Sequence, residues 1–134
     1  VAGPRASSAN YLLGHRDGLK SSADARAHLR YWAGLLGGGE GNAEAALARV
    51  GLSAIARLPV RVLSQGQQRR VSLARLLVAP RPVWLLDEPA AALDTGGKKL
   101  VADLVAEHCA QGGVAIAAVH EALGVAPARA IELT

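Results

Sequence analysis

The sequence contains, at residues 83–89, the stretch Val83-Trp84-Leu85-Leu86-Asp87-Glu88-Pro89. Its first four residues are continuously apolar, which predicts a buried strand. A second apolar run, Val114-Ala115-Ile116-Ala117-Ala118-Val119, follows after a predicted helix at 95–111 that Gly112-Gly113 ends. Unbroken apolar strands separated by a helix are typical of a parallel sheet, so we expect an α/β fold with helices on both faces of the sheet.

Polar residues follow both apolar runs. Asp87 and Glu88 come after the first run, and His120 comes after the second. In open α/β sheets, ligands bind outside the carboxyl ends of the strands. Adjacent carboxylates are costly to hold at such a place unless they are solvated, metal-bound or paired. This edge of the sheet is therefore the candidate site, although a buried strand ending in a charged turn gives the same pattern.

Capping residues, glycines and helical spacing predict the other elements. They are a strand at 9–14, helices at about 22–36 and 43–50 with caps at Ser22 and Asn42 and ends at Gly37-Gly38-Gly39 and Gly51, a helix from Ser64 to Pro80, and a short strand at 130–133. Residues 21–62 thus form a small helical insert.

The octet Leu63-Ser64-Gln65-Gly66-Gln67-Gln68-Arg69-Arg70 opens the third predicted helix. Ser64 and Gln67 have the spacing of a capping box, which by itself indicates only a helix start. The free N–H groups of the first turn, beside a glycine without a side chain, also suit an anion such as phosphate.

Composition narrows the class of protein. The 134 residues are 51% hydrophobic and 19% charged with a formal net charge of +4, which indicates a folded domain. The Lys and Arg residues are scattered without interleaved aromatic residues, so we expect no nucleic-acid partner. No apolar run reaches the roughly 20 residues that span a bilayer, so we expect neither a membrane span nor an export signal. A single cysteine, Cys109, excludes an internal disulfide.

These motifs, in this order, resemble the ATP-binding cassette (ABC) ATPases. The octet at 63–70 is similar to the family's signature, and the stretch at 83–89 is similar to its Walker B segment. Ala92-Leu93-Asp94 resembles the D-loop, and His120 stands where the family has its switch histidine. The resemblance implies a P-loop NTPase-like fold with a small helical subdomain, and ATP hydrolysis coupled to a membrane transporter.

The resemblance also implies roles for single residues. Asp87 would hold Mg²⁺, Glu88 would act as general base, and His120 would contact the γ-phosphate of ATP. Two such subunits pair head to tail, so the nucleotide-binding residues of the signature and D-loop would meet a partner subunit; they are Ser64, Gln65, Gly66, Gln67 and Asp94.

The family's phosphate-binding loop, G-x-x-x-x-G-K-[ST], does not occur in the 134 residues. We expect it to precede Val1, which makes residues 1–134 a partial ABC ATPase domain that is inactive alone. Residues 21–80 would be the helical subdomain with the signature helix, and residues 1–20 and 81–134 would belong to the α/β core.

A second departure concerns the Q-loop, where His15 stands in place of the usual Gln and would contact the nucleotide or couple the subunits. The stretch Gly14 to Lys20 resembles one branch, the ATP-binding subunit of the haem exporter of cytochrome c maturation, as do Tyr11-Leu12, Arg30-Tyr31-Trp32 and the end of the octet. This branch implies a peripheral protein on the cytoplasmic face of the inner membrane. An ATPase of another transporter and a non-transport ABC protein remain alternatives.

The remaining candidates are predicted to be structural. We expect His28, His108 and Cys109 to lie on helix faces, the histidines without partners, and Trp32 to lie in the core or at a subunit interface. The arginines of the third helix are expected on a solvated face; they are Arg69, Arg70 and Arg75.

Overall fold

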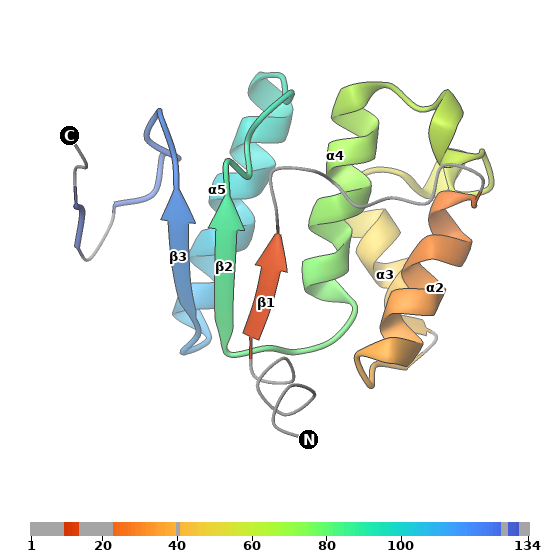
Figure 1. Cartoon of the computed structure of the whole chain (residues 1–134), viewed down its shortest axis with the longest axis horizontal. Coiled ribbons are helices and arrows are strands. Elements are labelled where there is room, and N and C mark those ends of the chain that lie inside the picture. The colour runs from red at the N-terminus through yellow and green to blue at the C-terminus, as the bar shows by residue number, and fades with distance from the viewer. Residues whose placement is uncertain (1–9, 14–22, 40, 127–128, 132–134) are drawn as a thin grey trace.

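A computed structural model of the chain describes residues 10–13, 23–39, 41–126 and 129–131. Its centre is a parallel sheet in the order β1-β2-β3, as Figure 1 shows. The strands are β1 (Asn10–Leu13), β2 (Val83–Asp87) and β3 (Val114–Ala118). The predicted parallel sheet and its three main strands are confirmed.

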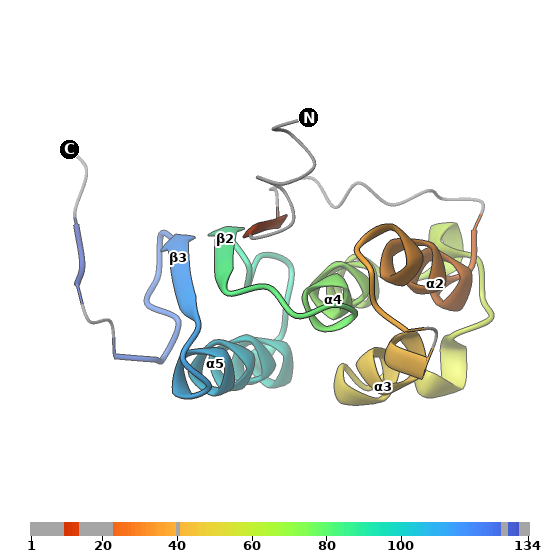
Figure 2. The same ribbon diagram turned by 90° about the horizontal axis from the view of Figure 1, so that it is seen from below.

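The helices form two groups. Helices α2 (Ala25–Leu35), α3 (Gly41–Arg49) and α4 (Gln65–Ala74) lie side by side beyond the β1 edge of the sheet, and α5 (Thr95–Ala110) lies along the sheet (Figures 1 and 2). Short 3-10 turns cover Ser53–Ile55, Val60–Val62 and Arg75–Leu77. No helix of the described residues is both long and apolar enough to cross a membrane.

The helix ends follow the predicted chemistry with three exceptions. The helix predicted from Ser64 to Pro80 ends at Ala74 as α4 and is followed by the 3-10 turn Arg75–Leu77. Asp24 caps α2, its carboxylate accepting from the N–H of Ala27 at 2.6 Å, so the prediction of Ser22 as cap is wrong. Asn42 lies inside the first turn of α3 instead of capping it, and its side-chain amide donates to the carbonyl of Val78 at 2.9 Å. Gly37 and Gly51 have φ values of +82° and +77° after α2 and α3, as expected of helix-ending glycines.

One connected cluster of buried side chains runs from the helical group to the sheet. Leu29, Leu47 and Leu73 bring α2, α3 and α4 together, and each is at most 1% exposed. Trp84 and Leu86 of β2 continue the cluster toward α5. The signature helix α4 is therefore packed against the same core as the strand that carries Asp87.

The sheet is covered on one face only in the described part of the chain. Figure 2 shows α5 against one face, while Val114 and Ile116, which point to the other, are 52% and 60% exposed. The described residues therefore do not meet the prediction of helices on both faces. An apolar strand predicts that both of its faces are covered, but it does not identify the segments that cover them. Residues 130 and 131 of the strand expected at 130–133 are not in a strand, and residues 132–133 lie outside the described residues.

Of the two histidines that were expected without partners, His108 has close neighbours, whereas the buried Nε2 of His28 has no hydrogen-bond partner among the described residues. The imidazole of His108 stacks on the indole of Trp84 with ring centroids 3.8 Å apart, and its Nε2 lies 3.2 Å from the carbonyl oxygens of Pro82 and Val114. His28 is buried, with its ring 6.3 Å from that of Trp32. Trp32 packs against the core, as predicted, and Cys109 is exposed on α5.

Candidate functional site

The carboxyl ends of β2 and β3 meet as the sequence predicts. Asp87 is the last residue of β2 and pairs in register with Ala118 of β3. The N–H of Glu88 donates to the carbonyl of Ala118 at 2.9 Å, so the hydrogen-bond ladder extends one residue beyond the strand. Glu88 then adopts φ +47°, and the N–H of Ala91 donates to its carbonyl at 3.0 Å. The chain therefore turns sharply at the second carboxylate.

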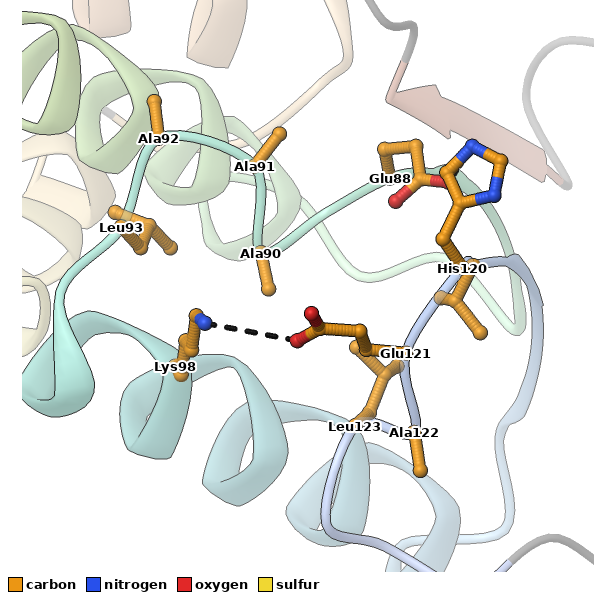
Figure 3. Close-up of a pocket in the computed structure, with 11 residues that line it drawn as sticks. Glu88, Ala90, Ala91, Ala92, Leu93, Lys98, His120, Glu121, Ala122 and Leu123 are labelled. Atoms are coloured by element: carbon orange, nitrogen blue, oxygen red, sulfur yellow. Dashed lines mark ion pairs between the residues drawn. The ribbon is translucent and has the colours of Figure 1, made fainter.

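The structure brings Glu88 and His120 together. The Nε2 atom of His120 lies 3.2 Å from Oε1 of Glu88, and Figure 3 shows the two side chains facing each other at the ends of their strands. The side chain of His120 is 93% exposed and that of Glu88 is 24% exposed. A carboxylate held between strand ends and an accessible imidazole can share or exchange a proton with a bound group in front of them.

These two residues border a hollow of about 300 Å³, the carboxylate pocket, whose other walls are the turn 90–93 and the segment 119–123. Lys98 of α5 and Glu121 approach each other across it, with Nζ 3.7 Å from Oε2 (Figure 3). Neither residue was predicted as part of the site. No signal in the sequence marks them, because α5 reaches the pocket only through its packing on the sheet.

The start of α4 forms a second hollow of about 380 Å³, the signature hollow, between the capping box and the D-loop. The Oγ of Ser64 accepts from the N–H of Gln67 at 3.1 Å, and the N–H of Ser64 donates to Oε1 of Gln67 at 2.9 Å, as the capping box predicts. The lining residues are Ser64, Gly66, Gln67, Arg70, Ala92, Leu93 and Asp94. Gln65 is exposed beside this hollow and does not line it.

Gly66 lies where α4 closely approaches the D-loop. A Cβ atom at this position would lie 3.2 Å from the carbonyl oxygen of Ala92, closer than side chains ordinarily pack. Asp94 caps α5 by accepting from the N–H of Gly97 at 2.8 Å, and Nη2 of Arg70 lies 3.8 Å from its Oδ1. Because Ala92 and Leu93 line both hollows, the D-loop is the wall between them.

The prediction that Arg69, Arg70 and Arg75 form a solvated face is wrong for Arg69 and Arg75, whereas Arg70 is partly exposed. Arg69 is 2% exposed and Arg75 is 6% exposed. Arg69 donates to the main-chain carbonyls of Asp87 and Glu88 at the end of β2, and the guanidinium of Arg75 lies 5.1 Å from the ring centroid of Trp32. Helical spacing carried the signal that was missed, since Arg69 precedes the buried Leu73 by one turn and so shares its face.

A divalent cation would find few protein ligands here. Among the described residues no group of three or more His, Cys, Asp and Glu side chains could hold a metal ion. Mg²⁺ commonly uses one or two carboxylates together with waters and phosphate oxygens, so the single carboxylate of Asp87 suits Mg²⁺ that arrives with a phosphate ligand. His15 lies outside the described residues, and its role stays a prediction.

Comparison with known proteins finds a match to the ABC transporter family over residues 10–91. Curated relatives carry the name cytochrome c biogenesis ATP-binding export protein CcmA. That of Nitrobacter winogradskyi is 49% identical over 116 residues, covering 87% of this chain and 58% of the relative. That of Bradyrhizobium diazoefficiens is 50% identical, covering 86% and 58%. That of Agrobacterium fabrum is 44% identical, covering 97% and 63%. The chain spans about three-fifths of the length of these relatives.

Proposed function

Because the chain belongs to the ABC transporter family, we propose that the complete protein binds and hydrolyses ATP to drive transport across a membrane. The observation that carries this proposal is the contact between His120 and Glu88, 3.2 Å apart, directly beside Asp87 at the ends of two parallel strands. A general base, a second polar group and a metal-binding carboxylate are what phosphoryl transfer to water needs in one place.

This proposal gives separate roles to Glu88, His120 and Asp87. A carboxylate oxygen of Glu88 accepts a proton from the attacking water, and the imidazole of His120 orients that carboxylate and meets the terminal phosphate. Asp87 would hold Mg²⁺, which supplies positive charge to the phosphate oxygens when bound. The two hollows are separated by the D-loop. This supports the view that one chain serves two nucleotides, its own through Glu88 and a partner's through the signature.

The P-loop is the part that this assignment still requires. The 134 residues contain no G-x-x-x-x-G-K-[ST], the sequence whose N–H groups and Lys hold the β- and γ-phosphates. We therefore propose that the 134-residue chain alone has negligible ATPase activity and weak nucleotide affinity. Purified chain that hydrolysed Mg-ATP as fast as an intact cassette would contradict the assignment of the motifs.

For the transported substrate, we propose haem export for cytochrome c biogenesis. The support is the name of the relatives, cytochrome c biogenesis ATP-binding export protein, together with their 44 to 50% identity to this chain. The partners would be a second ATPase subunit in a head-to-tail dimer and membrane-spanning subunits, with the protein on the cytoplasmic face of the inner membrane. An ATPase of another transporter, or a non-transport ABC protein, is the alternative.

The test of ATP hydrolysis is Glu88→Gln in the complete protein. Since the substitution keeps the shape of the side chain and removes the base, ATP binding should persist while kcat falls about 10²- to 10⁴-fold. Glu107→Gln is the matched control, because that exposed carboxylate pairs with Arg49 away from the pocket. A Glu88→Gln protein that hydrolyses ATP at a near wild-type rate would exclude Glu88 as the base.

The test of the branch is made in cells. A strain that carries Glu88→Gln should lose holo-cytochrome c while other ATP-driven uptake continues, and the Glu107→Gln strain should keep both. Normal haem attachment in the Glu88→Gln strain, with the protein expressed at the wild-type level, would reject haem export and leave the broader ABC assignment.

A further inference from the structure

Arg69 connects the signature helix to the turn that holds Glu88. It lies in α4, five residues after Ser64, and is 2% exposed. Its Nη2 atom lies 3.0 Å from the carbonyl oxygen of Asp87 and 2.6 Å from that of Glu88, and its Nε lies 3.3 Å from the carbonyl oxygen of Pro89. One guanidinium thus binds three successive peptide units.

The shape of this turn explains why a guanidinium suits it. Glu88 has the left-handed φ of +47°, an uncommon conformation for a residue with a side chain, and it brings successive carbonyl dipoles toward one point. A planar fork of fixed donors can satisfy several carbonyls at once, which a single ammonium cannot do as well. A buried charge is tolerated only when it is hydrogen-bonded in this way. The contacts therefore fix the peptide units on both sides of Glu88.

We propose that Arg69 is a positioning residue for Glu88, holding its main chain so that the carboxylate meets His120 and the attacking water. The inference rests on the proposed ATPase function and deepens it. Because Arg69 and Ser64 belong to one helix, the same contacts tie the position of the signature hollow to that of the carboxylate. A displacement of the signature helix by a partner's nucleotide would then move the base of the chain's own site.

Arg81 provides a matched comparison. Its guanidinium also donates to main-chain carbonyls, those of Leu36 at 2.6 Å and Pro80 at 2.9 Å. Arg81 precedes β2, whereas Asp87 ends it, so its contacts are at the opposite end of the strand. A substitution at Arg81 therefore tests the loss of a carbonyl-bound guanidinium without touching the turn at Glu88.

The experiment measures kcat, KM and the melting temperature of the complete protein with Arg69→Lys, Arg69→Gln and the control Arg81→Lys. Displacing a reacting group by about 1 Å lowers rates up to roughly 100-fold, so we expect kcat to fall about 10- to 100-fold in both Arg69 variants. KM should change by less than about threefold, because Arg69 is proposed to position Glu88 and not to bind the nucleotide. Arg81→Lys should keep kcat.

A double mutant separates positioning from general destabilisation. If Arg69 acts through Glu88, then Arg69→Lys should lower turnover no further in a protein that already carries Glu88→Gln, as single-turnover hydrolysis would show. The inference is overturned if the two losses multiply, if both Arg69 variants keep kcat, or if both unfold where Arg81→Lys stays folded. A Glu88→Gln protein with normal turnover would instead overturn the proposed function itself.

Discussion

The helical group and the sheet differ in how completely they bury their apolar residues. Leu29, Leu47 and Leu73 of α2, α3 and α4 are at most 1% exposed, whereas Val114 and Ile116 of β3 are more than half exposed. The two candidate hollows differ in how many parts of the chain build them. The signature hollow lies between one helix N-terminus and the D-loop, whereas the carboxylate pocket is assembled from two strand ends, a turn and α5. A pocket built from several distant segments depends more on the packing of the whole fold than a hollow that begins at one helix N-terminus.

The largest expected effect is on the signature hollow. In the complete protein, Ser64→Arg should lower ATP turnover about 100-fold or more, because the new side chain fills the space in which a partner's nucleotide would lie. Phosphate release from Mg-ATP is the measurement. Ser53→Arg is the control, since Ser53 is also exposed but stands in a 3-10 turn away from both hollows. Equal rates in the two variants would show that this hollow does not contribute to turnover.

The difference in burial predicts unequal effects on stability. In the 134-residue chain, Leu73→Ala should lower the free energy of unfolding by about 2–5 kcal/mol, because it opens a cavity in a filled core. Ile116→Ala should lower it by less than about 1 kcal/mol, since 60% of that residue is already in contact with water. Urea denaturation of both variants checks this, and losses of the same size would remove the distinction between the two parts.

The core of the helical group should also make stability depend on pH. Burial, and then the positive charge of Arg75, lower the pKa of His28 from 6.5 to about 4. The unfolded chain takes up a proton on His28 as the pH falls through 6.5, but the folded protein resists it until about pH 4. The titration of His28 therefore does not reduce the free energy of unfolding above pH 6.5. Between pH 6.5 and 4 it reduces this free energy by on the order of 2–3 kcal/mol.

Urea denaturation across this pH range measures the effect of His28. A His28→Gln protein has no group to titrate at this position, so its free energy of unfolding should fall less steeply as the pH decreases. The prediction fails if wild type and His28→Gln lose stability in parallel between pH 6.5 and 4.

The smallest effect concerns the cap of α4. Replacing Ser64 with Ala removes the oxygen that accepts from the N–H of Gln67, so the free energy of unfolding should fall by about 1 kcal/mol. Ser64→Asn keeps an acceptor at the cap and should have nearly wild-type stability. Thermal denaturation distinguishes the two, and an Asn variant as unstable as the Ala variant would show that capping is not the cause.

Patterns between residues that are close in sequence were enough to predict much of this protein's secondary structure. The capping box of Ser64 and Gln67 is a contact between residues three positions apart, and the glycines at 37 and 51 end their helices through their own backbone freedom. The apolar runs predicted β2 and β3, and the parallel order then placed Asp87, Glu88 and His120 at one edge. These features follow from local hydrogen bonding and from the shared direction of parallel strands.

Tertiary structure alone decided what the buried polar side chains bind. Arg69 and Arg75 have the composition of a solvated face, yet both are buried, because α4 packs between the other helices and the end of β2. His108 stacks on Trp84 across α5 and the sheet, and Lys98 reaches Glu121 over the carboxylate pocket. Spacing along one helix shows which residues share a face. It does not specify which distant segment packs against that face.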